Sequence, residues 1–258
     1  MRREQEERPI HAHAGVFQTT CWDQFHLAKT LDASSRRPVI EALTSRYWRP
    51  VYCFLLRKGR GQEEALDLTQ GFFQEIVLGK GLFEKADPLK GRFRTFLLTA
   101  LTRYVSMEHR RQSARKRTPP QEVLHLDVAD LYNLPVLEYA GSPEQAFMYS
   151  WGADLLERAM VEVETECRSD GRGVHWQVFY ERVARPILEE TDAPDLGEVC
   201  RRFGIEDTKT ASNMVITVKR RFRAAVQRLL GETLGTGADV DDELSDLVAI
   251  LSDHGSAA

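Results

Sequence analysis

Short polar side chains recur at helical spacing near the carboxyl end of the chain. Thr210, Asn213, Thr217 and Arg220 lie three to four residues apart, so they share one face of a helix. An apolar stripe follows the same period on the other face, with Val215, Val218, Phe222, Val226 and Leu229. Hydroxyl and amide groups beside an arginine are suited to hydrogen bonding with base edges in the major groove of DNA. The pattern favours a helix that packs by one face and offers the other to nucleic acid.

A shorter amphipathic helix is predicted just before this one. Its apolar positions are Leu196, Val199, Cys200 and Phe203. Gly204 supplies a turn and Ile205 plugs the core beneath it, while Asp207 or Thr208 caps the following helix. Lys209, Arg221 and Arg223 flank the polar face and are the candidates for phosphate contacts. A helix-turn-helix is therefore predicted over residues 196–230.

Charge is distributed unevenly along the 258 residues. The net charge is −4, but residues 232–258 carry seven acids and no lysine or arginine, which leaves +3 over residues 1–231. Two basic stretches stand out, residues 102–118 and residues 208–230. Two separated basic stretches suggest two contacts with a polyanion; the alternative is a pair of solvated helix faces.

Helical periodicity continues through the rest of the chain. Apolar positions recur every three or four residues over 39–56, around Leu68 and Phe72, over 93–105, over 151–163 and again over 176–183. Pro50 predicts a kink or break in the first of these helices. Residues 119–150, with Pro119, Pro120, Pro135 and Pro143, are interpreted as a flexible linker. No segment alternates as a strand does, so an all-α fold of two small helical domains is expected.

Several classes of protein are disfavoured by composition. The chain has no apolar run of bilayer length and no apolar stretch after its initial charges, so a cytoplasmic location and no membrane contact are expected. The four cysteines lie far apart, which favours reduced thiols. His11 and His13 have no ligand partners at suitable spacing. We expect no metal, no cofactor and no enzymatic activity.

Three segments together resemble bacterial RNA polymerase sigma factors of the extracytoplasmic-function type. Residues 67–73 (DLTQGFF) resemble the family's D-L-x-Q-x-x-F segment, and residues 47–52 (YWRPVY) precede it at the usual distance. Residues 91–98 (GRFRTFLL) resemble the start of the family's promoter-melting helix. The resemblance covers the chain from about Trp22 to Leu230, with Arg103 standing where many members have asparagine.

The resemblance implies a division of the chain and three sets of site residues. A mobile arm (1–20) precedes a sigma region 2-like domain (21–118), and the linker (119–150) leads to a region 4-like helix-turn-helix domain (151–231) and an acidic tail (232–258). The polymerase-binding set is Asp67, Leu68, Gln70 and Phe73. The minus-10 set is Arg103, Glu108, His109, Arg110, Arg111 and Arg115. The minus-35 set is Lys209, Thr210, Ser212, Asn213, Thr217, Arg220, Arg221 and Arg223.

The implied function is that of an alternative sigma factor. Its expected partners are bacterial core RNA polymerase, promoter DNA with minus-10 and minus-35 elements, and an inhibitory anti-sigma protein. A stand-alone helix-turn-helix repressor or adaptor is the main alternative, and a scaffold that binds only proteins is a second one. Two local alternatives also stand. Glu108 either accepts from a base or pairs with Arg111 at i+3, and the acidic end is either a docked helix or a solubilising tail.

Overall fold

The computed structural model describes residues 33–74, 91–114, 141–234 and 239–252, and all regular structure within these ranges is helical. Five helices are longer than twelve residues: α2 (Ala33–Arg57), α5 (Phe93–Ala114), α6 (Pro143–Ser169), α10 (Thr208–Gly231) and α11 (Val240–Ser252). The shorter elements are α3 (Gln62–Phe72), α7 (Gly173–Phe179), a π-helical turn (Tyr180–Ala184), α8 (Arg185–Leu188) and α9 (Leu196–Phe203). The predicted all-α class is confirmed for the described ranges.

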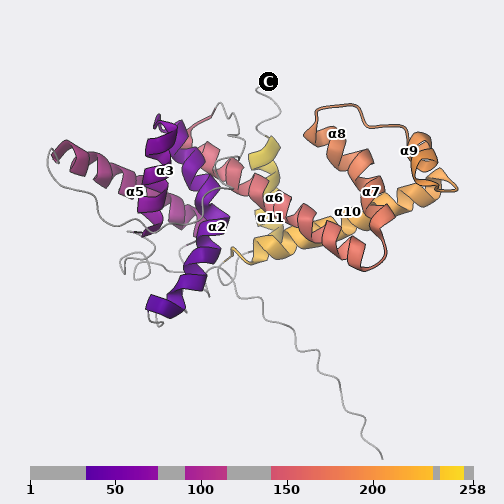
Figure 1. Cartoon of the computed structure of the whole chain (residues 1–258), viewed down its shortest axis with the longest axis horizontal. Coiled ribbons are helices and arrows are strands. Elements are labelled where there is room, and N and C mark those ends of the chain that lie inside the picture. The colour runs from indigo at the N-terminus through magenta and orange to yellow at the C-terminus, as the bar shows by residue number, and fades with distance from the viewer. Residues whose placement is uncertain (1–32, 75–90, 115–140, 235–238, 253–258) are drawn as a thin grey trace, which may run out of the picture.

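The long helix α6 connects the two ends of the molecule (Figure 1). Helices α2, α3 and α5 lie at one end, where α2 packs along α6. Helices α7, α8 and α9 lie at the other end, where α10 packs on both α6 and α7. Helix α11 lies between the ends, against α6 and α10. Helices α6 and α10 thus hold together helices that lie far apart in the sequence.

One apolar core runs through both ends of the described molecule. It joins Trp48 of α2, Phe72 of α3 and Phe93 of α5 to Trp151 of α6 and, beyond them, to α7, α10 and α11. The largest side chains in it are almost completely buried; they include Tyr47, Trp48, Phe54, Phe72, Phe73, Phe93 and Phe147. In this structure the two halves predicted from the sequence thus share a packed interface through α6.

Helix α2 passes through Pro50 without a break. Of the predicted kink or break, the break does not occur, because residues on both sides of the proline are anchored in the core: Tyr47 and Val51 are 1% and 0% exposed. Proline removes one helical hydrogen bond, and burial of the neighbouring aromatic side chains offsets that loss.

Helix α6 begins eight residues earlier than the periodicity indicated. Ser142 accepts a hydrogen bond from the Gln145 backbone, and the Gln145 side chain accepts one from the Ser142 backbone, with Pro143 in the first turn. This is a capping box. Phe147 is fully buried, so the last part of the range predicted as linker belongs to the packed helix. The rest of that range, up to residue 140, and the predicted N-terminal arm lie outside the described residues.

Candidate nucleic-acid interface

Helices α9 and α10 form the helix-turn-helix geometry that the sequence predicts. Asp195 caps α9 by accepting from the Gly197 backbone at 2.8 Å, and Gly204 ends that helix in the left-handed conformation (φ 65°). Asp207 caps α10 by accepting from the Thr210 backbone at 2.7 Å. Of the two cap candidates, Asp207 is the one used. The hydrogen bonds from Thr210 lower the pKa of the Asp207 carboxyl.

A small apolar cluster fixes α9 against α10. Val178, Val199, Cys200 and Ala211 are buried together, and Ile205 packs against them. The Ile205 backbone also donates to the Cys200 carbonyl at 2.9 Å. Ile205 therefore plugs the core beneath the turn, as its position predicted, and the start of α10 is set by both packing and capping.

The outer face of α10 carries most of the predicted contact residues. Lys209, Thr210, Asn213, Arg220 and Arg223 are exposed, whereas Ser212 and Thr217 are half-buried. The inner stripe is buried at Val218, Val226 and Leu229 and partly buried at Val215 and Phe222. The division into an inner apolar face and an outer polar face is confirmed.

Local hydrogen bonds restrict what the two threonines on this face can offer. Thr210 donates its hydroxyl to Asp207 at 3.0 Å, and Thr217 donates its hydroxyl to the Asn213 carbonyl at 2.8 Å. Their oxygens keep acceptor capacity. Asn213 presents an amide, which pairs well with adenine. Ile216, 60% exposed, lies beside it; it could not be predicted as part of this face, because a single apolar residue outside the stripe carries no periodic signal.

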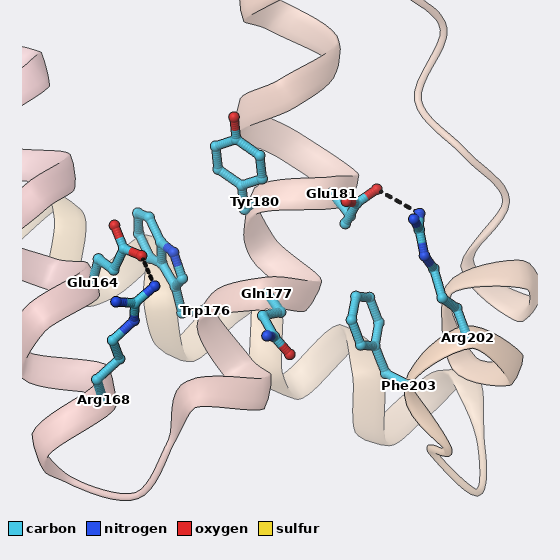
Figure 2. A pocket seen from close by; sticks show the side chains of 8 residues that line it. All are labelled: Glu164, Arg168, Trp176, Gln177, Tyr180, Glu181, Arg202 and Phe203. Carbon is cyan, nitrogen blue, oxygen red and sulfur yellow. Dashed lines mark hydrogen bonds and ion pairs between the residues drawn. The ribbon is translucent and has the colours of Figure 1, made fainter.

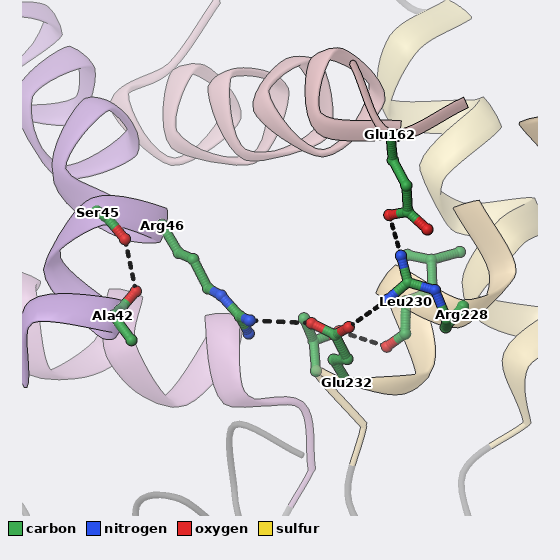
Figure 3. A network of polar contacts seen from close by, with 8 residues as sticks. Ala42, Ser45, Arg46, Glu162, Arg228, Leu230 and Glu232 are labelled. Carbon is green, nitrogen blue, oxygen red and sulfur yellow. Dashed lines mark hydrogen bonds and ion pairs between the residues drawn. The ribbon is translucent and has the colours of Figure 1, made fainter. Parts of the chain in front are cut away.

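Two arginines of the carboxyl-terminal basic stretch are held by internal ion pairs. Arg221 donates to Asp170 at 2.8 Å. Arg228 pairs with Glu162 and with Glu232, the latter at 2.7 Å, and Glu232 also lies 3.0 Å from Arg46 (Figure 3). This network joins α2, α6 and α10. In this arrangement Arg221 is therefore not directed outward with Arg220 and Arg223.

Five of the six predicted minus-10 residues lie on α5, between Arg103 and Arg111. Arg103, His109 and Arg110 are exposed. Glu108 accepts from Arg111 at 2.8 Å, so the i+3 ion pair is the one of the two alternatives that forms here. Arg115 lies outside the described residues. The exposed basic side chains of α5 and those of α10 belong to opposite ends of the molecule (Figure 1).

The predicted polymerase-binding set is divided by burial. Asp67 is exposed and Gln70 is half-buried, on one side of α3. Leu68 and Phe73 are 7% and 2% exposed, and Phe73 stacks on Trp48 at 5.8 Å between ring centroids. Leu68 and Phe73 therefore support the helix from inside, and only Asp67 and Gln70 are accessible to a partner.

The open groove between α6, α7 and α9 is lined by residues whose charges are already paired. Arg202 lies 3.0 Å from Glu181, and Arg168 lies 2.5 Å from Glu164 (Figure 2). Trp176 and Phe203 form its apolar part. Because these charges neutralise each other, the groove offers no isolated charged group for a reaction or for an ionic ligand.

The described ranges hold neither a metal-ligand group nor a membrane-spanning helix. No group of three or more metal-ligating side chains occurs there, and no described helix is long and apolar enough to span a membrane. Cys53, Cys167 and Cys200 are buried thiols, and burial raises the pKa of Cys53.

The described chain is thus an all-helical protein with a helix-turn-helix at one end and a second exposed basic helix at the other. Comparisons with protein families, characterised proteins and solved structures give no match to it.

Proposed function

We propose that this protein is an alternative sigma factor, which binds bacterial core RNA polymerase and directs it to promoters. The observation that carries the proposal is the outer face of α10, where Asn213 and Arg220 are exposed on a helix fixed by the α9 turn. A helix with one packed face and one polar, cationic face suits the major groove. The minus-35 element is its proposed target.

The second basic helix supports a two-site contact with DNA. Arg103 and Arg110 are exposed on α5, and Arg110 lies beyond Val105, the last buried position of this helix. Arginines on such a helix suit the backbone of opened DNA. The proposed target of α5 is the minus-10 element, and an anti-sigma protein is the proposed regulator. A site of action in the cytoplasm belongs to the same proposal.

The accessible side of α3 is the proposed contact with polymerase. Asp67 and Gln70 offer an acid and an amide to a basic or amide-rich surface. The test is co-elution with core RNA polymerase in gel filtration. Wild-type protein should co-elute, and the double variant Asp67→Arg, Gln70→Ala should not. Asp192→Arg, a charge reversal at an exposed position outside α3, is the control that should still co-elute.

A stand-alone helix-turn-helix repressor is the second candidate. The burial of Leu68 and Phe73 favours it, because it reduces the accessible polymerase-binding set to two residues. A repressor would bind duplex DNA without polymerase. If Lys209, Lys219, Arg220 and Arg223 each neutralise one phosphate, the slope of log affinity against log salt is about −3 to −4. Such binding together with failure to co-elute would select the repressor.

A further inference from the structure

Helix α11 packs against α6 at Gly152, a position that has no side chain. Leu247 is 2% exposed, and its Cδ1 lies 2.9 Å from where a Cβ at Gly152 would be. Leu251 Cδ2 lies 3.3 Å from the same point. Any side chain at Gly152 would push against both leucines. The glycine of α6 therefore allows α11 to approach closely.

Acidic side chains of α11 pair with two arginines. Arg92 lies just before α5, and Arg94 lies in its first turn. Glu243 is completely buried and pairs with Arg92 at 2.6 Å and with Arg94. Asp246 pairs with Arg92 as well. Arg94, 2% exposed, also lies over the Trp151 ring, 4.3 Å from its centroid. The carboxylates of α11 thus cover the guanidinium groups of Arg92 and Arg94.

The docking of α11 includes ion pairs that are buried at Glu243 and Arg94. A buried ion pair brings little net stability, because desolvation of both ions offsets their attraction. Removing one partner is costly, since the other charge is left buried. A competing anion that reaches the arginines satisfies them equally well. Nucleic acid, with one phosphate per nucleotide, is such an anion.

The covered arginines lie at the start of the helix that carries the exposed ones. Arg92 lies one residue before α5 and Arg94 in its first turn, whereas Arg103 and Arg110, seven residues apart, share the exposed face further along and lie on the opposite side of the helix from Arg94. A phosphate at Arg92 would lie near the amino-terminal end of α5, where the helix dipole also favours negative charge. With α11 docked, Glu243 and Asp246 occupy this position in place of phosphate.

We propose that α11 is an intramolecular clasp that covers a phosphate-binding site made by Arg92 and Arg94. Release of α11 exposes this site to the DNA backbone. The inference deepens the proposed function, because it adds regulation and a further contact to the DNA-binding role. Its test needs only DNA binding by the isolated protein, so it can succeed or fail independently of the polymerase contact.

The test compares three single variants and one double variant, all full length. Gly152→Leu fills the space into which α11 packs and alters no charge. It also replaces a glycine in a helix interior by a better helix former. Glu243→Gln removes the central carboxylate. Asp242→Asn is the matched control, because Asp242 is exposed on the same helix and the substitution changes net charge by the same amount. Hydrogen exchange of residues 240–252 reports release of α11, and anisotropy of a fluorescein-labelled mixed-sequence DNA duplex reports binding.

We expect faster exchange in α11 and about a fivefold to tenfold gain in affinity for the duplex in Gly152→Leu and Glu243→Gln. Asp242→Asn should change neither by more than about twofold. Adding Arg92→Gln to Gly152→Leu should abolish most of the gain. The proposal is overturned if α11 exchanges faster and affinity stays unchanged, if all three variants gain equally, or if α11 exchange does not change in either test variant.

Discussion

Arg221 of α10 donates a hydrogen bond from Nη2 to Asp170 at 2.8 Å, at the carboxyl end of α6. The sequence placed Arg221 among the phosphate contacts because it lies in a run of arginines. The structure instead ties it to α6 while its neighbours Arg220 and Arg223 are exposed. The ion pair between Arg221 and Asp170 can restrain the helix-turn-helix relative to α6, and one substitution can break it.

Asp170→Asn should raise the affinity of the protein for duplex DNA about threefold. The substitution removes the charge that holds Arg221, which can then reach a phosphate and steepen the salt dependence by about one unit of slope. The ion pair is partly exposed, so stability should change by less than about 1 kcal/mol. Fluorescence anisotropy at several salt concentrations measures this. Asp192→Asn, on an exposed residue before α9, is the control; an equal gain there would contradict the release of Arg221.

Asn213→Ala and Arg223→Gln should weaken DNA binding in different ways. Asn213 is assigned to a base edge, so its loss should cost about 1–3 kcal/mol on the selected sequence and relax the preference at one position. Arg223 is assigned to a phosphate, so its loss should weaken binding to all sequences and reduce the salt slope by about one. Selection from a randomised duplex library followed by titration separates the two. The same loss on every sequence for Asn213→Ala would contradict base contact.

Stability should depend on pH through Asp154, which is paired with Arg49 at 2.7 Å across α2 and α6. Burial raises the pKa of Asp154 to about 6, against the lowering effect of Arg49. Because the folded-state pKa exceeds the unfolded value, protonation favours the folded state: this contribution is present at low pH and is lost as pH rises through about 6.

The measurement is urea unfolding of the wild type and Asp154→Asn. Between about pH 7.5 and about pH 5, the wild type should gain roughly 1 kcal/mol relative to the variant. Other titrating groups cancel in this difference. A relative loss for the wild type over the same interval would show that Arg49 outweighs burial.

Gly204→Ala should destabilise the protein by about 1 kcal/mol. Gly204 has φ 65° at the end of α9, a conformation that is costly for residues with a Cβ. Gly231→Ala is the matched control, because Gly231 lies in α10 with no heavy atom within 4 Å of a built Cβ. It should be neutral or stabilising by roughly 0.5 kcal/mol. Thermal unfolding measures the stability of both variants. Equal changes in stability would contradict a special requirement for glycine at the left-handed position 204.

The helices themselves could be predicted because their apolar period is local information. Phe93 to Val105 follow a strict period, and α5 begins at Phe93. The turn at Gly204 is encoded by one residue type in the same way. Ser142 and Gln145 carried a capping-box signal for the start of α6, but the interpretation of residues 119–150 as linker rested on prolines and so began the helix late.

The partners of charged residues could not be predicted, because they depend on tertiary packing. Arg94, Glu243 and Asp154 resemble surface residues in the sequence, yet they are buried or partly buried between helices. The helical period of α11 could be predicted, but the sequence left open whether this helix docks or forms a solubilising tail. Its packing against Gly152 shows that it is docked. Burial also separates Leu68 and Phe73 from Asp67 and Gln70, although all four belong to one motif.

The central claim is tested most directly by transcription in vitro with bacterial core RNA polymerase and a library of promoter-length DNA. Wild-type protein should give discrete transcripts that are absent without it. The Asp67→Arg, Gln70→Ala variant should give none, while Asp192→Arg should retain them. The absence of any protein-dependent transcript from wild-type protein and from the Gly152→Leu variant, whose clasp is released, would contradict the assignment as a sigma factor.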